Sequence, residues 1–266
     1  MSDPVLFETD GAIATITLNR PETRNALDQD VIEAIESICA GINRNIDIRV
    51  AIVTGAGPGF SSGGNVKDMR DRQGLFGGSP AKMRDNYRNG IQRIPLALYR
   101  IEVPTIAAVN GPAIGAGLDL SLMCDMRIAG ESAVFAESFV KVGIIPGDGG
   151  AWLLPHAISL SRACEMAFTG DRINAQLALQ YGLVSQVVPD GKLIDAAMAL
   201  AHRVSVNPPE VLRMTKSLIR EGQRVGLDTL LELSAAMQAV AQHTKDHREA
   251  ISAMFEKRSP VFTGER

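Results

Sequence analysis

The sequence predicts an α/β fold in which strand–turn–helix units stack on one another, followed by a helical C-terminal region. Three observations support this prediction. A short β-branched run that leads into glycines and then into a helical pattern begins near residue 49 and recurs near residue 104 and, more weakly, over residues 126–136. The recurrence lacks the exact period of a short-repeat solenoid. From residue 193 onward, strand patterns disappear and only helical patterns remain.

The first segments are expected to form a hairpin and a helix. Two strand patterns, residues 5–9 and 12–18, flank Asp10-Gly11, a dipeptide typical of two-residue hairpin turns. A helix is expected from about Asp28, because apolar residues recur at helical spacing on one face: Val31, Ile35, Ile38, Cys39 and Ile42. The hairpin and the helix therefore precede the first glycine-rich segment.

Two glycine-rich segments each follow the pattern of a buried strand. Residues 49–54 lead into GAGPGFSSGGNVK at 55–67, and residues 104–109 lead into NGPAIGAGLDLSLMCD at 110–125, which turns on glycines and then becomes helical. The first N–H groups of a helix are unpaired and lie at the positive end of its dipole. Two such turns predict two N–H donors that meet at one anionic group. Residues 74–80 are expected to form a mobile loop where a lid over the ligand would lie.

Helical patterns fill the C-terminal part of the chain, at residues 193–204, 209–221, 227–242 and 248–255. Asn207-Pro208-Pro209 interrupts them and marks the predicted boundary between a core, residues 1–205, and a helical C-terminal region, residues 206–266. The apolar residues of this region exceed what a lone pair of surface helices would expose: Leu227, Leu230, Leu231, Met237 and Val240. We therefore expect the region to pack between subunits of a homotrimer or hexamer.

The composition narrows the class of protein. The chain has 266 residues, of which 45% are hydrophobic, and this is ample for a sizeable core. Its net charge of -3 argues against nucleic acid as the main partner. The first residues lack the features of a secretory signal, and no apolar run approaches the length that crosses a bilayer, so we expect a soluble cytoplasmic protein without a membrane partner. Three widely spaced cysteines in apolar helical patterns are expected to be reduced core residues: Cys39, Cys124 and Cys164.

Asp119 places one carboxyl group in an otherwise apolar helical stretch. An ionisable group in such a place must be paired, protonated or functional, because desolvation raises the pKa of a carboxyl group towards neutrality. One interpretation is a salt bridge with an arginine such as Arg127, with the glycines of this segment serving only close packing. The other interpretation is a catalytic group, and the second glycine-rich segment favours it.

Motifs spread along nearly the whole chain reveal a family resemblance. FSSGGNV at 60–66 and the segment 110–125 are similar to the two glycine-rich segments of the crotonase superfamily, the enoyl-CoA hydratases and isomerases. Further matching motifs follow in the expected order: TLNRPE at 17–22, RNAL at 24–27, GIIPG at 143–147, LLP at 153–155, TGDR at 169–172, YGLV at 181–184 and FEKRSP at 255–260. The resemblance implies a crotonase-like spiral of ββα units with a C-terminal helical oligomerisation region, commonly assembled as trimers or paired trimers. It is much less specific for the reaction.

The resemblance also implies roles for individual residues. The backbone N–H groups of Gly64 and Ala116 are expected to hold the oxygen of a CoA thioester and to stabilise the enolate formed at its α-carbon, at roughly 3–4 kcal/mol for each donor. Residues expected along the CoA are Ala26, Leu27, Gly64, Asn65, Val66 and Lys67. Lys257 matches a C-terminal lysine that approaches the CoA phosphates in family members, although a solvated lysine at a helix end remains an alternative.

One position departs from the family pattern. Asp119 falls where hydratases carry the first of two catalytic glutamates and where several isomerases carry aspartate. The second glutamate falls on Phe139, which cannot transfer a proton, whereas syn addition of water needs two carboxyl groups that hold one water. Asp148 is a substitute for it, unless Asp148 is only the N-cap of the helix that follows. Glu137 is a weaker candidate, which could equally be a solvated strand residue.

The sequence therefore predicts an acyl-CoA enzyme of the enoyl-CoA hydratase/isomerase type that works through a thioester enolate in an oxyanion hole. Asp119 is expected to transfer protons, with Asp148 as the second carrier if it is more than a cap. The loss of the second glutamate favours isomerisation. We expect no metal and no cofactor other than the CoA of the substrate. Two alternatives remain open: a crotonase-fold C–C hydrolase of a cyclic β-diketone, and an acyl-CoA-binding protein that has lost catalysis.

Overall fold

A six-stranded sheet forms the centre of the structure, a computed structural model in which residues 3–265 are described. Its strands, in spatial order, are β1 (Val5–Asp10), β2 (Ile13–Leu18), β3 (Val50–Gly55), β4 (Thr105–Val109), β6 (Met126–Gly130) and β9 (Gln186–Val188). β1 and β2 pair antiparallel and every other neighbouring pair is parallel. The hairpin predicted at Asp10-Gly11 is confirmed, and Gly11 adopts a φ of 54° in its turn.

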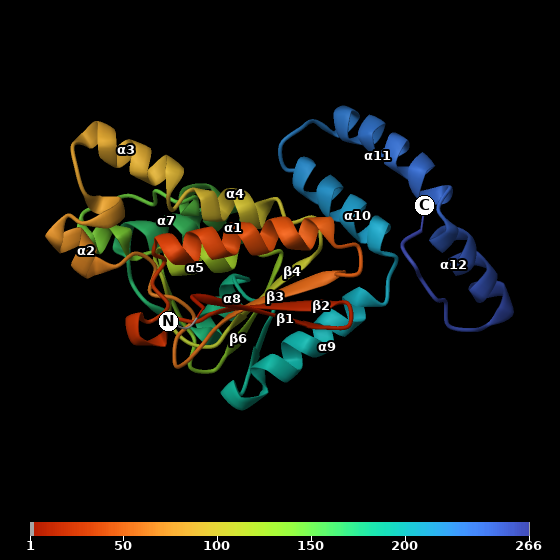
Figure 1. Cartoon of the computed structure of the whole chain (residues 1–266), viewed down its shortest axis with the longest axis horizontal. Helices are drawn as coiled ribbons and strands as arrows, with labels where there is room; N and C mark the ends of the chain where they lie inside the picture. The colour runs from red at the N-terminus through yellow and green to blue at the C-terminus, as the bar shows by residue number, and fades with distance from the viewer. Residues whose placement is uncertain (1–2, 266) are drawn as a thin grey trace.

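Helices cover both faces of this sheet (Figure 1). α1 (Gln29–Arg44) packs with α4 (Arg93–Tyr99) over one face, and α9 (Leu193–Ser205) packs against β3 and β4 on the other. Alternate residues of β3 divide between these two cores: Ala51 and Val53 lie under α1, whereas Val50 and Ile52 lie under α9. Burial on both faces explains why this strand is a continuous apolar run.

α1 begins where the sequence predicts. The side chain of Asp28 accepts a hydrogen bond from the backbone N–H of Val31 at 3.0 Å, as an N-cap residue does. The apolar face of α1 is buried in the main core at Val31, Ile35, Cys39 and Ile42. The amphipathic pattern therefore fixes both the helix and the face that it buries.

A second sheet of three short strands lies next to the candidate site. Its order is β5 (Ala113–Ile114), β7 (Val134–Ala136) and β8 (Ile173–Asn174). β5 leads directly into α5 (Ala116–Leu122), and β7 leads into the 3-10 helix η3 (Ser138–Val142). α6 (Gly150–Ala157), α7 (Leu160–Thr169) and α8 (Ala175–Tyr181) complete this part of the fold.

The segment between β3 and α4 is more regular than the sequence predicts. It contains α2 (Val66–Asp71), a 3-10 helix η2 (Gly74–Phe76) and α3 (Pro80–Asn89), which projects from the molecule (Figure 1). The mobile loop expected over residues 74–80 contains η2 and the first residue of α3, and its mobility stays a prediction. Ser79 accepts a hydrogen bond from the N–H of Lys82 and Pro80 occupies the first turn, so the pair starts a helix.

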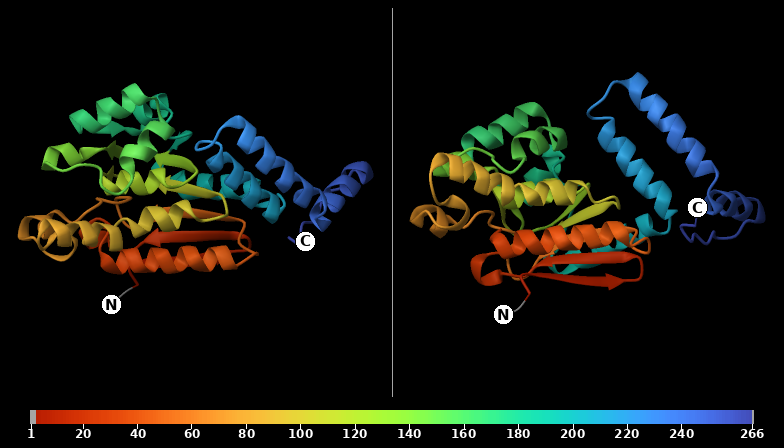
Figure 2. Two further views of the ribbon diagram at one scale, coloured as in Figure 1. Left: turned by 90° about the horizontal axis from the view of Figure 1, so that it is seen from above. Right: turned by 45° about the horizontal axis from the view of Figure 1, so that its top comes forward.

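The predicted C-terminal helices are confirmed as α10 (Pro209–Glu221), α11 (Leu227–Gln242) and α12 (Lys245–Glu256). α10 is attached to the core by Lys216, whose Nζ lies 2.6 Å from the carbonyl oxygen of Val103 and 2.8 Å from a carboxyl oxygen of Asp125. α11 and α12 extend away from the sheet (Figures 1 and 2). The division of the chain at residue 205 falls between α9 and α10 and stays a prediction.

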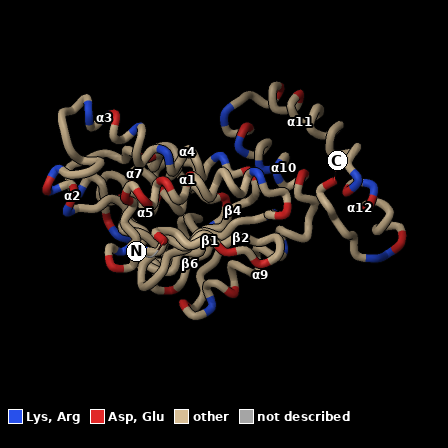
Figure 3. The backbone as a smooth tube through the Cα atoms, viewed as in Figure 1, with Lys and Arg blue, Asp and Glu red and all other residues tan. Residues whose placement is uncertain are grey.

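The surface carries mixed charge. Figure 3 shows Lys and Arg interspersed with Asp and Glu along the described chain. Within residues 3–265, no helix combines the length and apolarity needed to cross a membrane. All three cysteines are free, and Cys164 differs from the core position that we expected in being only partly buried.

Candidate active site

The two glycine-rich segments meet at the start of α5. A parallel bridge pairs Ser61 with Ala113. A Cβ on Gly117 would lie 2.1 Å from the carbonyl oxygen of Ser61, and a Cβ on Gly63 would lie 2.9 Å from the backbone nitrogen of Ala116. Both distances are too short for any side chain, so glycine is required where the two backbones approach each other.

This approach leaves two backbone N–H groups beside one small cavity. Within residues 3–265, neither the N–H of Gly64 nor that of Ala116 donates a hydrogen bond. Ala116 is the first residue of α5 and Gly115 precedes it with a φ of 54° and a ψ of -123°, so this N–H has no intrahelical acceptor. Both residues line a cavity of about 30 Å³, which we call the thioester cavity. Their role as oxyanion donors stays a prediction.

Three buried carboxyl groups form a cluster that reaches this cavity through Asp148. Asp119 is 0% exposed, Glu137 is 1% exposed and Asp148 is 3% exposed. A Cβ on Gly150 would lie 2.3 and 2.5 Å from the carboxyl oxygens of Asp119 and 2.5 Å from Oε1 of Glu137. Asp119 and Glu137 therefore meet at the α-carbon of Gly150, and a larger residue there would displace them. We call the three residues the carboxyl cluster.

The structure rejects the salt bridge considered for Asp119. The guanidinium group of Arg127 donates to the carbonyl oxygens of Leu183 at 2.7 Å and Cys124 at 2.8 Å. Within the described chain, neither carboxyl oxygen of Asp119 has a hydrogen-bond partner. Such a buried group without a partner is costly to the fold, which is typical of functional sites.

The structure also rejects the cap interpretation of Asp148. The N-cap of α6 is Gly149, and no side chain of the described chain caps this helix. Both carboxyl oxygens of Asp148 lack a hydrogen-bond partner within residues 3–265. The expectation that Glu137 could be solvated is likewise wrong, because α6 packs over it at Gly150. Glu137 is thus buried beside Asp119, which its sequence pattern does not indicate.

Burial raises the pKa of all three carboxyl groups. The pKa of Asp119 is raised well above its usual range, first by burial and then by the charges of Asp148 and Glu137. Burial and the charge of Asp148 raise the pKa of Glu137 to about 8. Burial also raises the pKa of Asp148, but the Asp119 side chain acts in the opposite direction. Because like charges this close disfavour joint ionisation, the cluster can hold protonated and ionised members together and can supply both an acid and a base.

The members of the cluster face different cavities. Asp148 lines the thioester cavity together with Ala116 and Phe139. Glu137 lines a second cavity of about 330 Å³ between η3, α6 and α7. Asp119, fully buried, interacts with both of them. The carboxyl cluster therefore lies between the thioester cavity, which Asp148 lines, and the second cavity, which Glu137 lines.

Side chains from the segment after β3 cover the oxyanion donors. A Cβ on Gly64 would lie 2.6 Å from Cε of Met69 and 3.2 Å from Cζ of Phe76, and Tyr87 of α3 also lines the thioester cavity. A cavity of about 30 Å³ is too small for a thioester, so these side chains must move for a substrate to enter. Phe76 belongs to residues 74–80, where a lid over the ligand is expected, whereas Met69 and Tyr87 were not predicted to line the cavity.

The residues expected along CoA lie at one end of the molecule, with one exception. Leu27 lines the thioester cavity, and Ala26 forms a bridge with Gly63. Asn65 accepts a hydrogen bond from the N–H of Lys67 at 3.0 Å and starts α2, and the Val66 side chain beside it is exposed.

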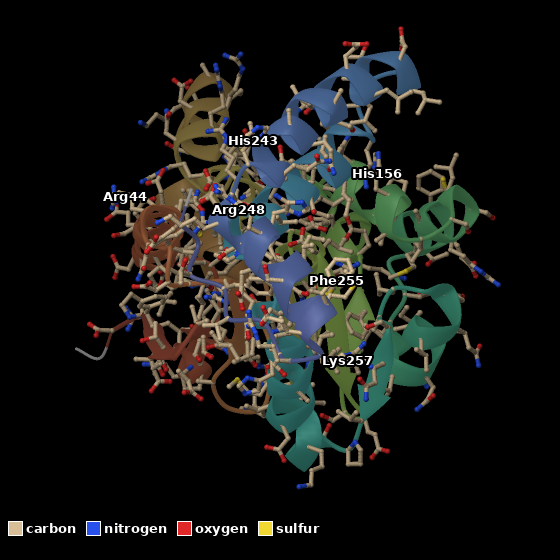
Figure 4. All side chains as sticks on the ribbon, turned by 90° about the vertical axis from the view of Figure 1, so that its right-hand side faces the viewer. Arg44, His156, His243, Arg248, Phe255 and Lys257 are labelled. Atoms are coloured by element: carbon tan, nitrogen blue, oxygen red, sulfur yellow. The ribbon has the colours of Figure 1, made fainter. Side chains whose placement is uncertain are left out.

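Lys257 is the exception. It ends α12 with a φ of 57°, and its side chain lies at the far end of the molecule from α2 (Figures 1 and 4). Within one chain, Lys257 is therefore not brought to the candidate site.

Comparison with known proteins assigns the family. A family model described as enoyl-CoA hydratase/isomerase matches residues 8–265. The chain belongs to this family. The chain is 35% identical to the 1,2-epoxyphenylacetyl-CoA isomerase of Escherichia coli, over 99% of this chain and 100% of that protein. It is 36% identical to the (E)-benzylidenesuccinyl-CoA hydratase of Thauera aromatica, over 98% of this chain and 99% of that protein.

Solved structures confirm the expected crotonase-like fold. The enoyl-CoA hydratase of Bacillus anthracis superposes with a TM-score of 0.92 at 36% identity, covering 98% of this chain and 100% of that one. Relatives of both the hydratase and the isomerase type are similar to this chain. The family membership therefore leaves the choice of reaction to the residues of the site.

The substitution Glu137→Gln is expected to stabilise the protein against unfolding more at pH 8 than at pH 5. The folded protein keeps a proton on Glu137 up to a pKa of about 8, whereas the unfolded chain releases it near the ordinary value of 4.5. Between these values the folded state binds more protons, so the contribution of this group to the free energy of unfolding is present below pH 4.5 and is lost as pH rises to 8. Glutamine does not titrate and removes this loss.

Thermal unfolding of both proteins at the two pH values measures the effect, with the exposed position Glu131→Gln as the control for removal of a carboxyl group. Equal changes in melting temperature at pH 5 and pH 8 for Glu137→Gln would contradict the raised pKa.

Proposed function

We propose that this member of the enoyl-CoA hydratase/isomerase family moves the double bond of an enoyl-CoA thioester by proton transfer. One observation carries the proposal: a cluster of three buried carboxyl groups lies beside two backbone N–H groups that have no acceptor within the described chain. Preorganised N–H donors stabilise the negative oxygen of an enolate, and carboxyl groups with raised pKa values exchange protons with carbon near neutral pH.

The proposed reaction balances through the three carboxyl groups. The N–H groups of Gly64 and Ala116 bind the thioester oxygen, and the Asp148 carboxylate removes a proton from the α-carbon of a 3-enoyl thioester. The resulting dienolate takes a proton at its γ-carbon from Glu137, which is protonated at neutral pH because its pKa is about 8. Asp119, whose pKa is raised by burial and by the charges of both, passes the proton from Asp148 to Glu137, which restores the starting state.

Phe139 favours isomerisation over hydration. Its ring lies 3.5 Å from the position of a Cβ on Gly115 and lines the thioester cavity with Ile144. Hydration needs a water held by two carboxyl groups, and an apolar ring is a poor neighbour for that water. Hydration is therefore the second candidate function, supported by the names of several relatives.

A panel of saturated, 2-enoyl and 3-enoyl CoA thioesters in heavy water, followed by mass spectrometry, tests the proposal. We expect 3-enoyl thioesters to become 2-enoyl thioesters with deuterium incorporated. A hydroxyacyl product would replace isomerisation by hydration. Binding without any turnover would favour the acyl-CoA-binding alternative, and a protein that binds no CoA thioester would favour an activity without CoA, such as β-diketone cleavage.

The exposed faces of the C-terminal helices support an oligomer. Leu227 and Leu231 of α11 are 72% and 58% exposed, and Phe255 of α12 is 83% exposed. Obligate oligomers bury such apolar faces between subunits, so we expect a homotrimer or hexamer. In that assembly Lys257 would reach CoA only from a neighbouring subunit. Light scattering at micromolar concentration measures the mass, and a monomer would reject both expectations.

A further inference from the structure

An apolar chamber begins at the carboxyl cluster. Glu137 and Gly150 form its inner end, and it extends between η3, α6 and α7 with a volume of about 330 Å³. Its walls are mainly aliphatic and aromatic, including Ile144, Leu154, Leu160, Ala163, Ala167 and Phe168. We call this space the apolar chamber.

The chamber and the thioester cavity share a wall. Ile144 lines both spaces. Asp148 faces the thioester cavity, Glu137 faces the chamber, and both interact with Asp119. A ligand whose thioester oxygen binds at Ala116 and whose carbon chain reacts at the cluster therefore continues into the chamber.

The lining of the chamber defines the chemistry that it accepts. Among the described residues that line it, the only polar side chain besides Glu137 is the thiol of Cys164, and none is a lysine or arginine. A carboxylate or hydroxyl at the end of an acyl tail would lose its hydration there without gaining a partner. An apolar tail has no polar group to desolvate, and burial of its apolar surface in the chamber favours binding.

The size of the chamber defines the bulk of that tail. A dry cavity of about 150 Å³ holds a benzene molecule. The chamber, at about 330 Å³, is roughly twice as large. It has room for a phenyl group, or for a chain of roughly six to eight carbon atoms beyond the reacting double bond.

We propose that the apolar chamber makes the enzyme select CoA thioesters with a bulky, uncharged hydrocarbon tail over crotonyl-sized and carboxyl-terminated ones. This inference rests on the proposed function, because it places the thioester at Gly64 and Ala116. The rim of the chamber is exposed, with Leu160 at 68% and Phe168 at 75%. Contact with a second copy of the chain is therefore the competing use of this surface.

The test combines binding and turnover. Dissociation constants of saturated acyl-CoA thioesters are measured by calorimetry, and kcat/KM is measured for enoyl thioesters with tails of increasing length, with a phenyl group and with a terminal carboxylate. We expect affinity to rise about three- to fourfold for each added methylene until the chamber is full. The carboxyl-terminated tail should bind more weakly than the apolar tail of the same length by about a hundredfold or more.

Ala167→Leu tests whether the chamber causes this preference. Ala167 is half-buried on α7, so leucine partly fills the chamber with little risk to folding, which circular dichroism checks. The ratio of kcat/KM for the octenoyl to the crotonyl thioester should fall at least about tenfold, since more than one methylene loses its place. Ala199→Leu on α9, which packs on the other face of the sheet, is the matched control and should keep the parent ratio.

The possible failures are distinguishable. Affinity that does not depend on the tail, or an unchanged ratio in Ala167→Leu, would overturn the inference and leave the proposed function standing. A changed oligomeric mass in Ala167→Leu with an unchanged tail preference would show that the chamber is a subunit contact and overturn the inference as well. Tail-dependent binding without turnover of any thioester would support the chamber and reject the proposed function.

Discussion

Ala116→Pro is expected to lower the turnover of an enoyl-CoA thioester by about a hundredfold or more. Proline has no backbone N–H, and the N–H of Ala116 has no acceptor within the described chain, so the substitution removes a donor to the substrate without breaking a hydrogen bond of the fold. Ala116 is the first residue of α5, a position where proline is tolerated. Steady-state kinetics measure the loss.

Ala116→Ser is the matched control. It keeps the N–H group at a nearly buried position with a small side chain, so it should retain most of the turnover. Circular dichroism establishes that both variants fold. Parent-like turnover in a folded Ala116→Pro variant would remove the oxyanion hole from this account.

Asp119→Asn is expected to abolish most turnover while leaving the fold intact. Asparagine has the shape of a protonated aspartic acid, the form that the raised pKa of Asp119 favours, but it cannot pass a proton from Asp148 to Glu137. We expect a loss of about a hundredfold or more in kcat with a nearly unchanged dissociation constant for a saturated acyl-CoA. Rapid-mixing kinetics and calorimetry measure the two quantities.

Asp148→Asn separates catalysis from helix capping in the same assay. Asp148 does not cap α6, whose N-cap is Gly149, so the melting temperature should barely change. Turnover should fall by about a hundredfold or more, because the base is lost. A variant at either position with full activity would show that its carboxyl group takes no part in proton transfer.

The sequence predicted regular, locally encoded features well. The expected helices at residues 209–221 and 227–242 coincide with α10 and α11, because Pro209 and the periodic apolar faces define them locally. α12 begins three residues earlier than residue 248, because Thr244 accepts a hydrogen bond from the N–H of His247 and caps the helix there. The two glycine-rich segments are visible in the sequence because their backbones approach each other closely. That approach requires glycine at Gly63 in the first segment and at Gly117 in the second.

Features that depend on distant segments were not predictable in this way. Glu137 directly follows the short strand β7, where nothing local predicts burial, and it is buried because Gly150 of α6 packs onto it. The apolar chamber likewise arises where η3, α6 and α7 come together, so no single stretch of sequence encodes it. The sequence of α5 points to Asp119 because all its other residues except Ser121 are apolar, which is a local signal.

Exchange of α-hydrogens with solvent shows whether the carboxyl cluster removes a proton from a thioester held at Gly64 and Ala116. A saturated acyl-CoA, which cannot be isomerised or hydrated, is incubated with enzyme in heavy water, and deuterium in the acyl group is followed by mass spectrometry. We expect measurable exchange with the parent protein and exchange slowed by about a hundredfold or more in Asp148→Asn, at a similar dissociation constant. Equal rates of exchange in the two proteins would contradict this role of the cluster.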